Sequence, residues 1–161
     1  MATELVLRVA SERSDASPGR ELVQAMLAEL EVMYGPLDPA VTPRASAEDM
    51  APPHGAFVVL YAPGPDGERA VACGGLKKLD ATTGEIKRMY VVPEARGRGV
   101  ARRLLGALED AARAAGYERV KLDTGAKQPH AQALYASAGY ASIADYNDNR
   151  YASCWFEKSL R

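Results

Sequence analysis

A short run of arginine and glycine is the part of this sequence best suited to binding an anion. Arg96-Gly97-Arg98-Gly99 comes directly before an apolar, helix-like pattern. Glycine removes side chains where a ligand could touch the backbone, and the first N–H groups of a helix carry the positive end of its dipole. Pyrophosphate fits such a cradle, and Arg102 adds charge to it. The spacing matches neither a Walker loop, because no Gly-Lys-Ser/Thr follows, nor the Gly-x-Gly-x-x-Gly of dinucleotide-binding proteins.

The residues around this run predict a strand, a turn and a helix. Residues 85–92 are rich in β-branched and aromatic side chains, as is typical of a strand. From Gly99 to Gly116 apolar residues recur at helical spacing, and another strand is expected over residues 118–123. Two parallel strands followed by helices should separate at their carboxyl ends. We therefore expect a slot between Val91-Val92 and Asp123-Thr124.

Two segments resemble the GNAT N-acetyltransferase superfamily. Arg96 to Ala101 is similar to its Arg-x-x-Gly-x-Ala acyl-CoA signature, and Ala133 to Tyr140 is similar to its Ala-x-x-Leu-Tyr-x-x-x-Gly-Phe/Tyr segment. The resemblance implies acetyl-CoA as co-substrate, with its pantetheine arm along the strand backbone and a backbone N–H near Val91 or Val92 polarising the thioester. The cofactor-binding residues that it implies are Tyr90, Val91, Val92, Arg96, Gly97, Arg98, Gly99, Val100, Ala101, Arg102, Thr124 and Tyr135.

Acetyl transfer to an amine needs a base for the amine and an acid for the departing thiolate. The resemblance assigns the acid to Tyr135, the signature tyrosine; the alternative is a core tyrosine with a satisfied hydroxyl. Glu85 is the candidate base, since its offset from Arg96 (96 − 85 = 11) matches the catalytic glutamate of the histone-acetyltransferase branch. Glu85 could instead be an ion-pair partner of Lys87 or Arg88, with a water chain serving as base.

Three further stretches bear on the acceptor. Lys87 or Arg88 is a candidate to reach the acceptor site and favour a carboxylate-bearing substrate; the alternative is that both cover the exposed side of the sheet. Asp123-Thr124-Gly125 departs from the asparagine often found there in the family, which leaves backbone contacts to the pantetheine. Residues 37–53 form a long irregular loop. In the resembling family this loop closes over the acceptor.

The whole chain, residues 1–161, is expected to be a single α/β domain of the GNAT type. We predict a mixed, mostly antiparallel sheet of about seven strands flanked by helices. Glu109 should lie on the solvent face of its helix, four residues before Arg113. The remaining expected strands span residues 5–9, 56–61, 70–79, 140–146 and 152–158, and the remaining helices span residues 20–34 and 129–137, with a possible short one at 45–50.

Composition bounds the partners and the setting. A net charge of −1 argues against a general nucleic-acid-binding protein, and no apolar run is long enough to cross a membrane. The two cysteines are expected to be reduced in a cytoplasmic protein, and the two distant histidines give no metal site. The expected partner is a small-molecule or peptide amine, and a homodimer is left open. The alternative function is a non-catalytic acyl-CoA-binding sensor domain.

Overall fold

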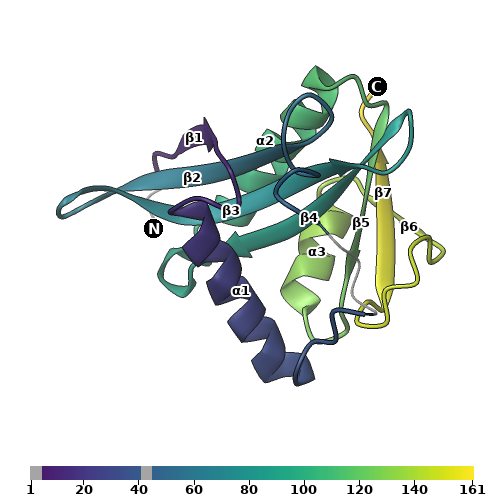
Figure 1. The fold of residues 1–161 in the computed structure, drawn as a ribbon, viewed down its shortest axis with the longest axis horizontal. Helices are drawn as coiled ribbons and strands as arrows, with labels where there is room; N and C mark the ends of the chain where they lie inside the picture. Colours follow the sequence, from purple (N-terminus) through teal and green to yellow (C-terminus); the bar gives the residue numbers. More distant parts are fainter. Residues whose placement is uncertain (1–4, 41–44) are drawn as a thin grey trace.

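One seven-stranded sheet forms the centre of the protein, as seen in a computed structural model that describes residues 5–40 and 45–161 (Figure 1). The strand order is β1-β2-β3-β4-β5-β7-β6, and β4 with β5 is the parallel pair among antiparallel ones. This confirms the predicted mixed α/β sheet. The strands are β1 (Arg8–Ser11), β2 (Ala56–Gly64), β3 (Gly67–Lys78), β4 (Thr83–Val91), β5 (Arg119–Thr124), β6 (Ala141–Ile143) and β7 (Cys154–Ser159).

The two parallel strands separate soon after they begin. Their ladder covers three pairs, from Thr83 opposite Arg119 to Glu85 opposite Lys121. Beyond these pairs, β4 continues to Val91 and β5 to Thr124 without a ladder between them. The edges of both strands therefore face a common gap at their carboxyl ends, where the slot was predicted.

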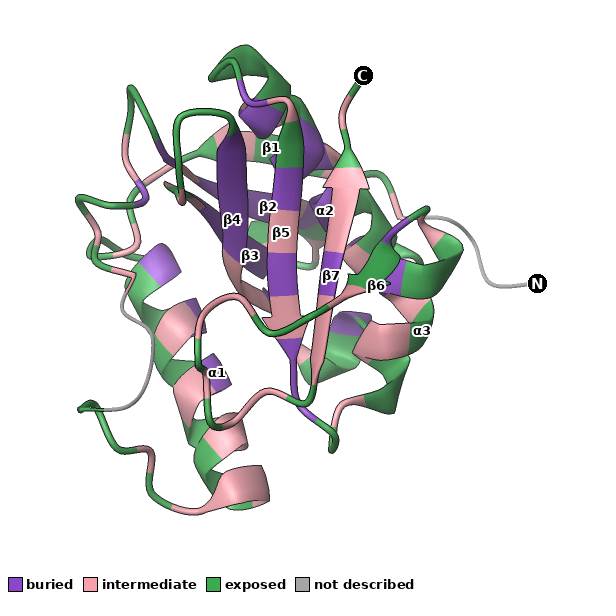
Figure 2. Ribbon diagram, turned by 90° about the vertical axis from the view of Figure 1, so that its right-hand side faces the viewer, coloured by how far each residue is buried: buried purple, intermediate pink, exposed green. Residues whose placement is uncertain are grey.

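Helices cover both faces of the sheet (Figure 1). Helix α1 (Gly19–Tyr34) packs through Leu22 and Met26 on one face, in a core cluster with Cys73 and Tyr90. Helices α2 (Val100–Ala114) and α3 (Pro129–Ser137) share the core cluster of the opposite face. In Figure 2 buried residues run through the central strand β4 and alternate with partly buried ones along β5, so polar side chains that are buried there need partners inside the protein.

Helix α2 follows directly from its apolar stripe. Leu104, Leu105 and Leu108 are each at most 1% exposed against the sheet. After its last turn, Gly116 adopts a φ of 90°, and the N–H of Tyr117 donates to the carbonyl of Ala112 at 3.0 Å, which satisfies a carbonyl at the helix end.

A bulge interrupts β4 where it passes the gap. Cys73 and Gly75 of β3 lie opposite Tyr90 and Lys87, so Arg88 and Met89 together face a single residue. Arg88 takes up the extra length with a φ of 60°. Such a bulge re-aims the side chains that follow it, and bulges are common next to functional sites.

Several element boundaries differ from those predicted. Strand β1 begins three residues later and ends two residues later than expected. The turn after β2 is shorter, because β2 runs to Gly64 and β3 begins at Gly67. Strand β6 ends at Ile143, because Tyr146 and its successors leave the sheet to contact Glu85. The short helix expected at residues 45–50 is a turn closed by mutual hydrogen bonds between Ser46 and Asp49. The predicted loop over residues 37–53 is described except for 41–44. Among the described residues, no helix is long and apolar enough to cross a membrane.

Candidate active site

A cavity of about 820 Å³ occupies the gap between β4 and β5. Its walls come from six parts of the chain: α1 and the residue Leu37, the second half of β4, the turn into α2, the end of β5, α3, and residues 149–152 before β7. Tyr90, Val91, Gly97, Gly99 and Tyr135 are among the predicted residues that line it. The structure thus brings the glycine-rich turn and the signature tyrosine to one cavity.

The glycine-rich turn presents bare backbone at the start of α2. Gly97 and Gly99 have φ angles of 75° and 79°, which side-chain-bearing residues rarely adopt. A Cβ built at either glycine would meet nothing within 4 Å, so the turn is open in front. The first recorded helical bond runs from the N–H of Arg103 to the carbonyl of Gly99 at 3.1 Å. The N–H groups of Val100, Ala101 and Arg102 precede it and belong to the unpaired first turn, as an anion site requires.

Arg96 and Arg102 contact protein groups beside this turn. Arg96 donates through Nε to the carbonyl of Val91 at 2.9 Å and pairs with Glu29 at 2.8 Å. Arg102 donates to Oγ of Ser137 at 2.5 Å, and Arg98 is exposed. The arginines therefore supply positive charge beside the turn, while the guanidinium of Arg96 also ties the end of β4 to α1.

Of Tyr90, Val91 and Val92, one residue turns its backbone N–H toward the gap. The N–H of Val92 donates to the carbonyl of Val71 in β3 at 2.9 Å, so it is committed to the sheet. Because N–H groups alternate between the two edges of a strand, Val91 turns its peptide toward the gap and Tyr90 turns its peptide toward β3. Of the three residues expected to contact the cofactor through their backbone, Tyr90, Val91 and Val92, Val91 is the one whose N–H can face a thioester.

Tyr135 presents a protonated phenol to the cavity. It is 7% exposed, and its hydroxyl donates to Sδ of Met89 at 3.5 Å, a weak acceptor. Burial, with a smaller contribution from the charge of Asp123, raises the pKa of the phenol above its usual value of 10.0. A phenol with a raised pKa keeps its proton at neutral pH, so the proton is available for transfer to a leaving group.

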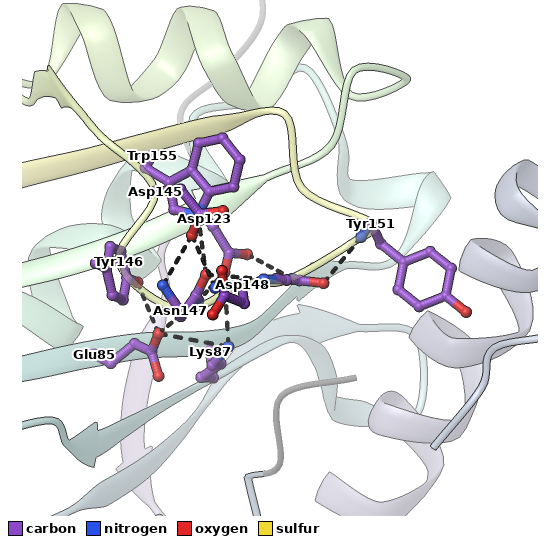
Figure 3. A network of polar contacts seen from close by, with 10 residues as sticks. Glu85, Lys87, Asp123, Asp145, Tyr146, Asn147, Asp148, Tyr151 and Trp155 are labelled. Carbon is purple, nitrogen blue, oxygen red and sulfur yellow. Dashed lines mark hydrogen bonds and ion pairs between the residues drawn. The ribbon is translucent and has the colours of Figure 1, made fainter. Parts of the chain in front are cut away.

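Glu85 lies in a buried polar cluster next to the cavity (Figure 3). It is 2% exposed and accepts hydrogen bonds from the hydroxyl of Tyr146 at 2.7 Å and from Asn147 at 3.2 Å. Nζ of Lys87 lies 3.6 Å from Glu85 and 3.9 Å from Asp123. Lys87 and Asp123 line the cavity and Glu85 lies behind them among the described residues. Glu85 is therefore the ion-pair partner of Lys87 in this structure, and its role as a base stays a prediction.

Comparison with known proteins identifies the family. The Acetyltransferase (GNAT) family profile matches residues 19–140. The chain belongs to the GNAT acetyltransferase family. It is 37% identical over 127 residues to the IAA acetyltransferase of Azospirillum brasilense, a match that covers 78% of this chain and 80% of the relative.

Solved GNAT structures share the fold of this family member. A GNAT-family acetyltransferase of Staphylococcus aureus is 17% identical with a TM-score of 0.74, over 97% of this chain and 100% of that one. A GNAT-family acetyltransferase of Elizabethkingia anophelis with acetyl-CoA bound is 14% identical with a TM-score of 0.62, over 95% of this chain and 97% of that one. At these identities the likeness establishes the fold.

The GNAT signature residues do not include every group that shapes this site. Asn147 and Asn149 both donate to Asp123, and Oδ1 of Asn147 accepts from the indole of Trp155 at 2.9 Å (Figure 3). In the sequence these asparagines lie between two expected strands, residues 140–146 and 152–158, and nothing there links them to Asp123. At the other side of the cavity, the hydroxyl of Tyr34 lies close to the backbone at Lys127. These contacts depend on the assembled fold.

Proposed function

We propose that this GNAT protein transfers the acetyl group of acetyl-CoA to a primary amine by direct attack within a ternary complex. The proposal rests on one observation: a single cavity, in the gap between β4 and β5, is lined both by the open turn at the start of α2 and by the protonated Tyr135. The turn can bind the pyrophosphate of acetyl-CoA, and Tyr135 can protonate the thiolate at the other end of the same molecule.

An unsatisfied polar atom supports the fit of this co-substrate. Oγ1 of Thr124 is buried and has no hydrogen-bond partner among the described residues, and Thr124 lines the cavity at the end of β5. A buried hydroxyl without a partner costs free energy, which a ligand's amide can offset. The pantetheine arm of acetyl-CoA carries such amides. The acetyl-CoA bound to the Elizabethkingia anophelis structure is consistent with this assignment.

The proposed reaction needs no covalent enzyme intermediate. The neutral amine attacks the thioester carbonyl, whose developing oxyanion the N–H of Val91 stabilises. The carbon–sulfur bond then breaks, and Tyr135 gives its proton to the departing thiolate. The ammonium formed by the attack loses a proton through water to the polar cluster of Glu85 and Lys87. The cluster releases this proton to solvent, and Tyr135 recovers one from solvent. Net transfer thus moves one amine proton to the thiol of CoA.

The test is release of free CoA thiol from acetyl-CoA in the presence of a panel of primary amines, with the acetylated product identified by mass spectrometry. The panel should include amino acids, polyamines, arylalkylamines and peptide N-termini. We expect amine-dependent thiol release and a product heavier by one acetyl group. Binding of acetyl-CoA without turnover across the panel would contradict the proposal and favour the sensor alternative.

A further inference from the structure

Arg88 lines the cavity, and no acceptor for its charge lies among the residues that the structure describes. We propose that the acceptor amine also carries a carboxylate, and that the guanidinium of Arg88 binds it. The inference rests on the proposed function, because it names the substrate class for the same transfer reaction. The substrates that it selects are small aminocarboxylates, in preference to polyamines or simple amines.

The bulge in β4 determines where Arg88 lies. Lys87, before it, pairs with Glu85 and Asp123, and Met89, after it, contacts the hydroxyl of Tyr135. Arg88 itself is partly buried, and its charge acts on Cys73, a member of the core cluster under α1. Arg88 therefore lies on the α1 side of the sheet, one residue from the methionine that touches the candidate acid.

The other cations of the cavity are already engaged. Lys87 pairs with two carboxylates, Arg96 pairs with Glu29, and Arg102 donates to Ser137. No hydrogen bond or ion pair is recorded for the guanidinium of Arg88 within residues 5–40 and 45–161. Burial lowers the pKa of Arg88, because the charged form loses water, yet an arginine keeps its charge at neutral pH. A partly desolvated cation without a partner is costly unless a ligand supplies the opposite charge.

The surroundings of Arg88 favour a small anionic acceptor. The acid that lines the cavity, Asp123, already accepts from Asn147 and Asn149 and lies near Lys87. The α1 wall adds apolar side chains from Met26, Leu27 and Leu30 that suit a carbon skeleton. A guanidinium binds a carboxylate through two parallel hydrogen bonds, which fixes orientation as well as affinity. A second ammonium group on the acceptor would be repelled by the same cation.

The experiment compares acceptors that differ in the carboxylate alone. Leucine, leucinamide and isoamylamine form one such set, and further amino acids extend it. The set to compare is the one whose amino acid is acetylated most efficiently. In the CoA-release assay we expect kcat/KM for that amino acid to exceed kcat/KM for its amide and for its decarboxylated amine by about 10- to 100-fold. Arg88→Asn should remove most of this preference, since asparagine tolerates the positive φ, and Arg88→Lys should keep part of it. Arg69→Gln, an exposed arginine of β3, is the matched control and should keep the preference.

A binding measurement separates this inference from the proposed function. Calorimetry of the N-acetylated amino acid and its amide, each titrated into the CoA-bound protein, reports the carboxylate contact without turnover. Carboxylate-dependent binding that Arg88→Asn abolishes supports the inference, even where no amine is acetylated and the proposed transfer fails. Equal use or equal binding of acid and amide by the wild type, or an unchanged preference in Arg88→Asn with normal CoA affinity, overturns it.

Discussion

Replacing Tyr135 with phenylalanine separates a catalytic hydroxyl from a structural one. The hydroxyl of Tyr135 donates to the thioether of Met89 at 3.5 Å, and sulfur is a weak acceptor. Its removal leaves no strong acceptor unpaired and keeps the ring packed against Tyr140 and Phe156, each at 5.7 Å between ring centroids. We therefore expect the free energy of unfolding to change by less than about 1 kcal/mol.

The effect on turnover should be far larger. A positioned general acid contributes about 10²- to 10⁴-fold to a rate, so kcat of Tyr135→Phe should fall by that factor while the affinity for CoA stays nearly constant. The assay is thiol release at saturating acetyl-CoA, with unfolding in urea and CoA calorimetry run on the same preparations. Turnover within a factor of three of the wild type would remove Tyr135 from the chemistry.

Tyr140→Phe is the matched control, because we expect it to lower stability and leave turnover nearly unchanged. Tyr140 is buried on the same side of the sheet, and its hydroxyl donates to Glu109 at 2.8 Å, with Lys158 on the other carboxylate oxygen at 3.0 Å. Loss of a hydrogen bond to a buried carboxylate should cost about 1.5–3 kcal/mol of stability. Turnover should change little, since Tyr140 does not line the cavity in the described structure. Equal effects of the two substitutions on rate and stability would refute the distinction.

Three further outcomes follow from the same geometry. Gly99→Asp should abolish CoA binding by bringing a carboxylate to the phosphate site. Gly99→Asn requires the same positive φ but adds no charge, so it should weaken CoA binding less. An equal loss of CoA affinity in the two variants, measured by calorimetry, would contradict an anion site at this turn. Gly125→Ala should lower stability by about 1–3 kcal/mol in urea unfolding, because its Cβ would overlap the hydroxyl of Tyr34, while Gly106→Ala, with nothing within 4 Å, should not lower it. Burial raises the pKa of Tyr135 above 10.0, so its acid form persists up to that pH. Deprotonation of Tyr135 should therefore not lower kcat below pH 10, and any fall of kcat in the wild type below that pH should also occur in Tyr135→Phe.

The sequence predicts well the elements whose signals are local. The apolar stripe and the glycines give α2 and its turn, and the bounds of α3, Pro129–Ser137, agree with those expected. The parallel neighbours β4 and β5, and hence the gap between them, follow from the order of elements along the chain. The predicted bounds of β1 are wrong, because a short, largely exposed edge strand has only a weak hydrophobic pattern in the sequence.

The contacts among the buried polar side chains could not be predicted from the local sequence pattern. Glu109 was expected on the solvent face, which is wrong: it is 6% exposed and holds Tyr140 and Lys158. The partners of Glu85 include Tyr146 and Asn147, about sixty positions further along the chain. Such contacts depend on how strands pair and where loops fold back. The bulge that re-aims Arg88 likewise depends on its register against β3.

The measurement that tests the account most directly is calorimetric titration of the folded protein with CoA and, in parallel, with pantetheine, which lacks the pyrophosphate. The open turn at Gly97 and Gly99 and the unpaired first N–H groups of α2 should give clear binding of CoA and much weaker binding of pantetheine. Gly99→Asp should erase the difference between the two ligands. Absence of heat with CoA, or equal affinity for both ligands in the wild type, would contradict the assignment of this helix start as the cofactor site.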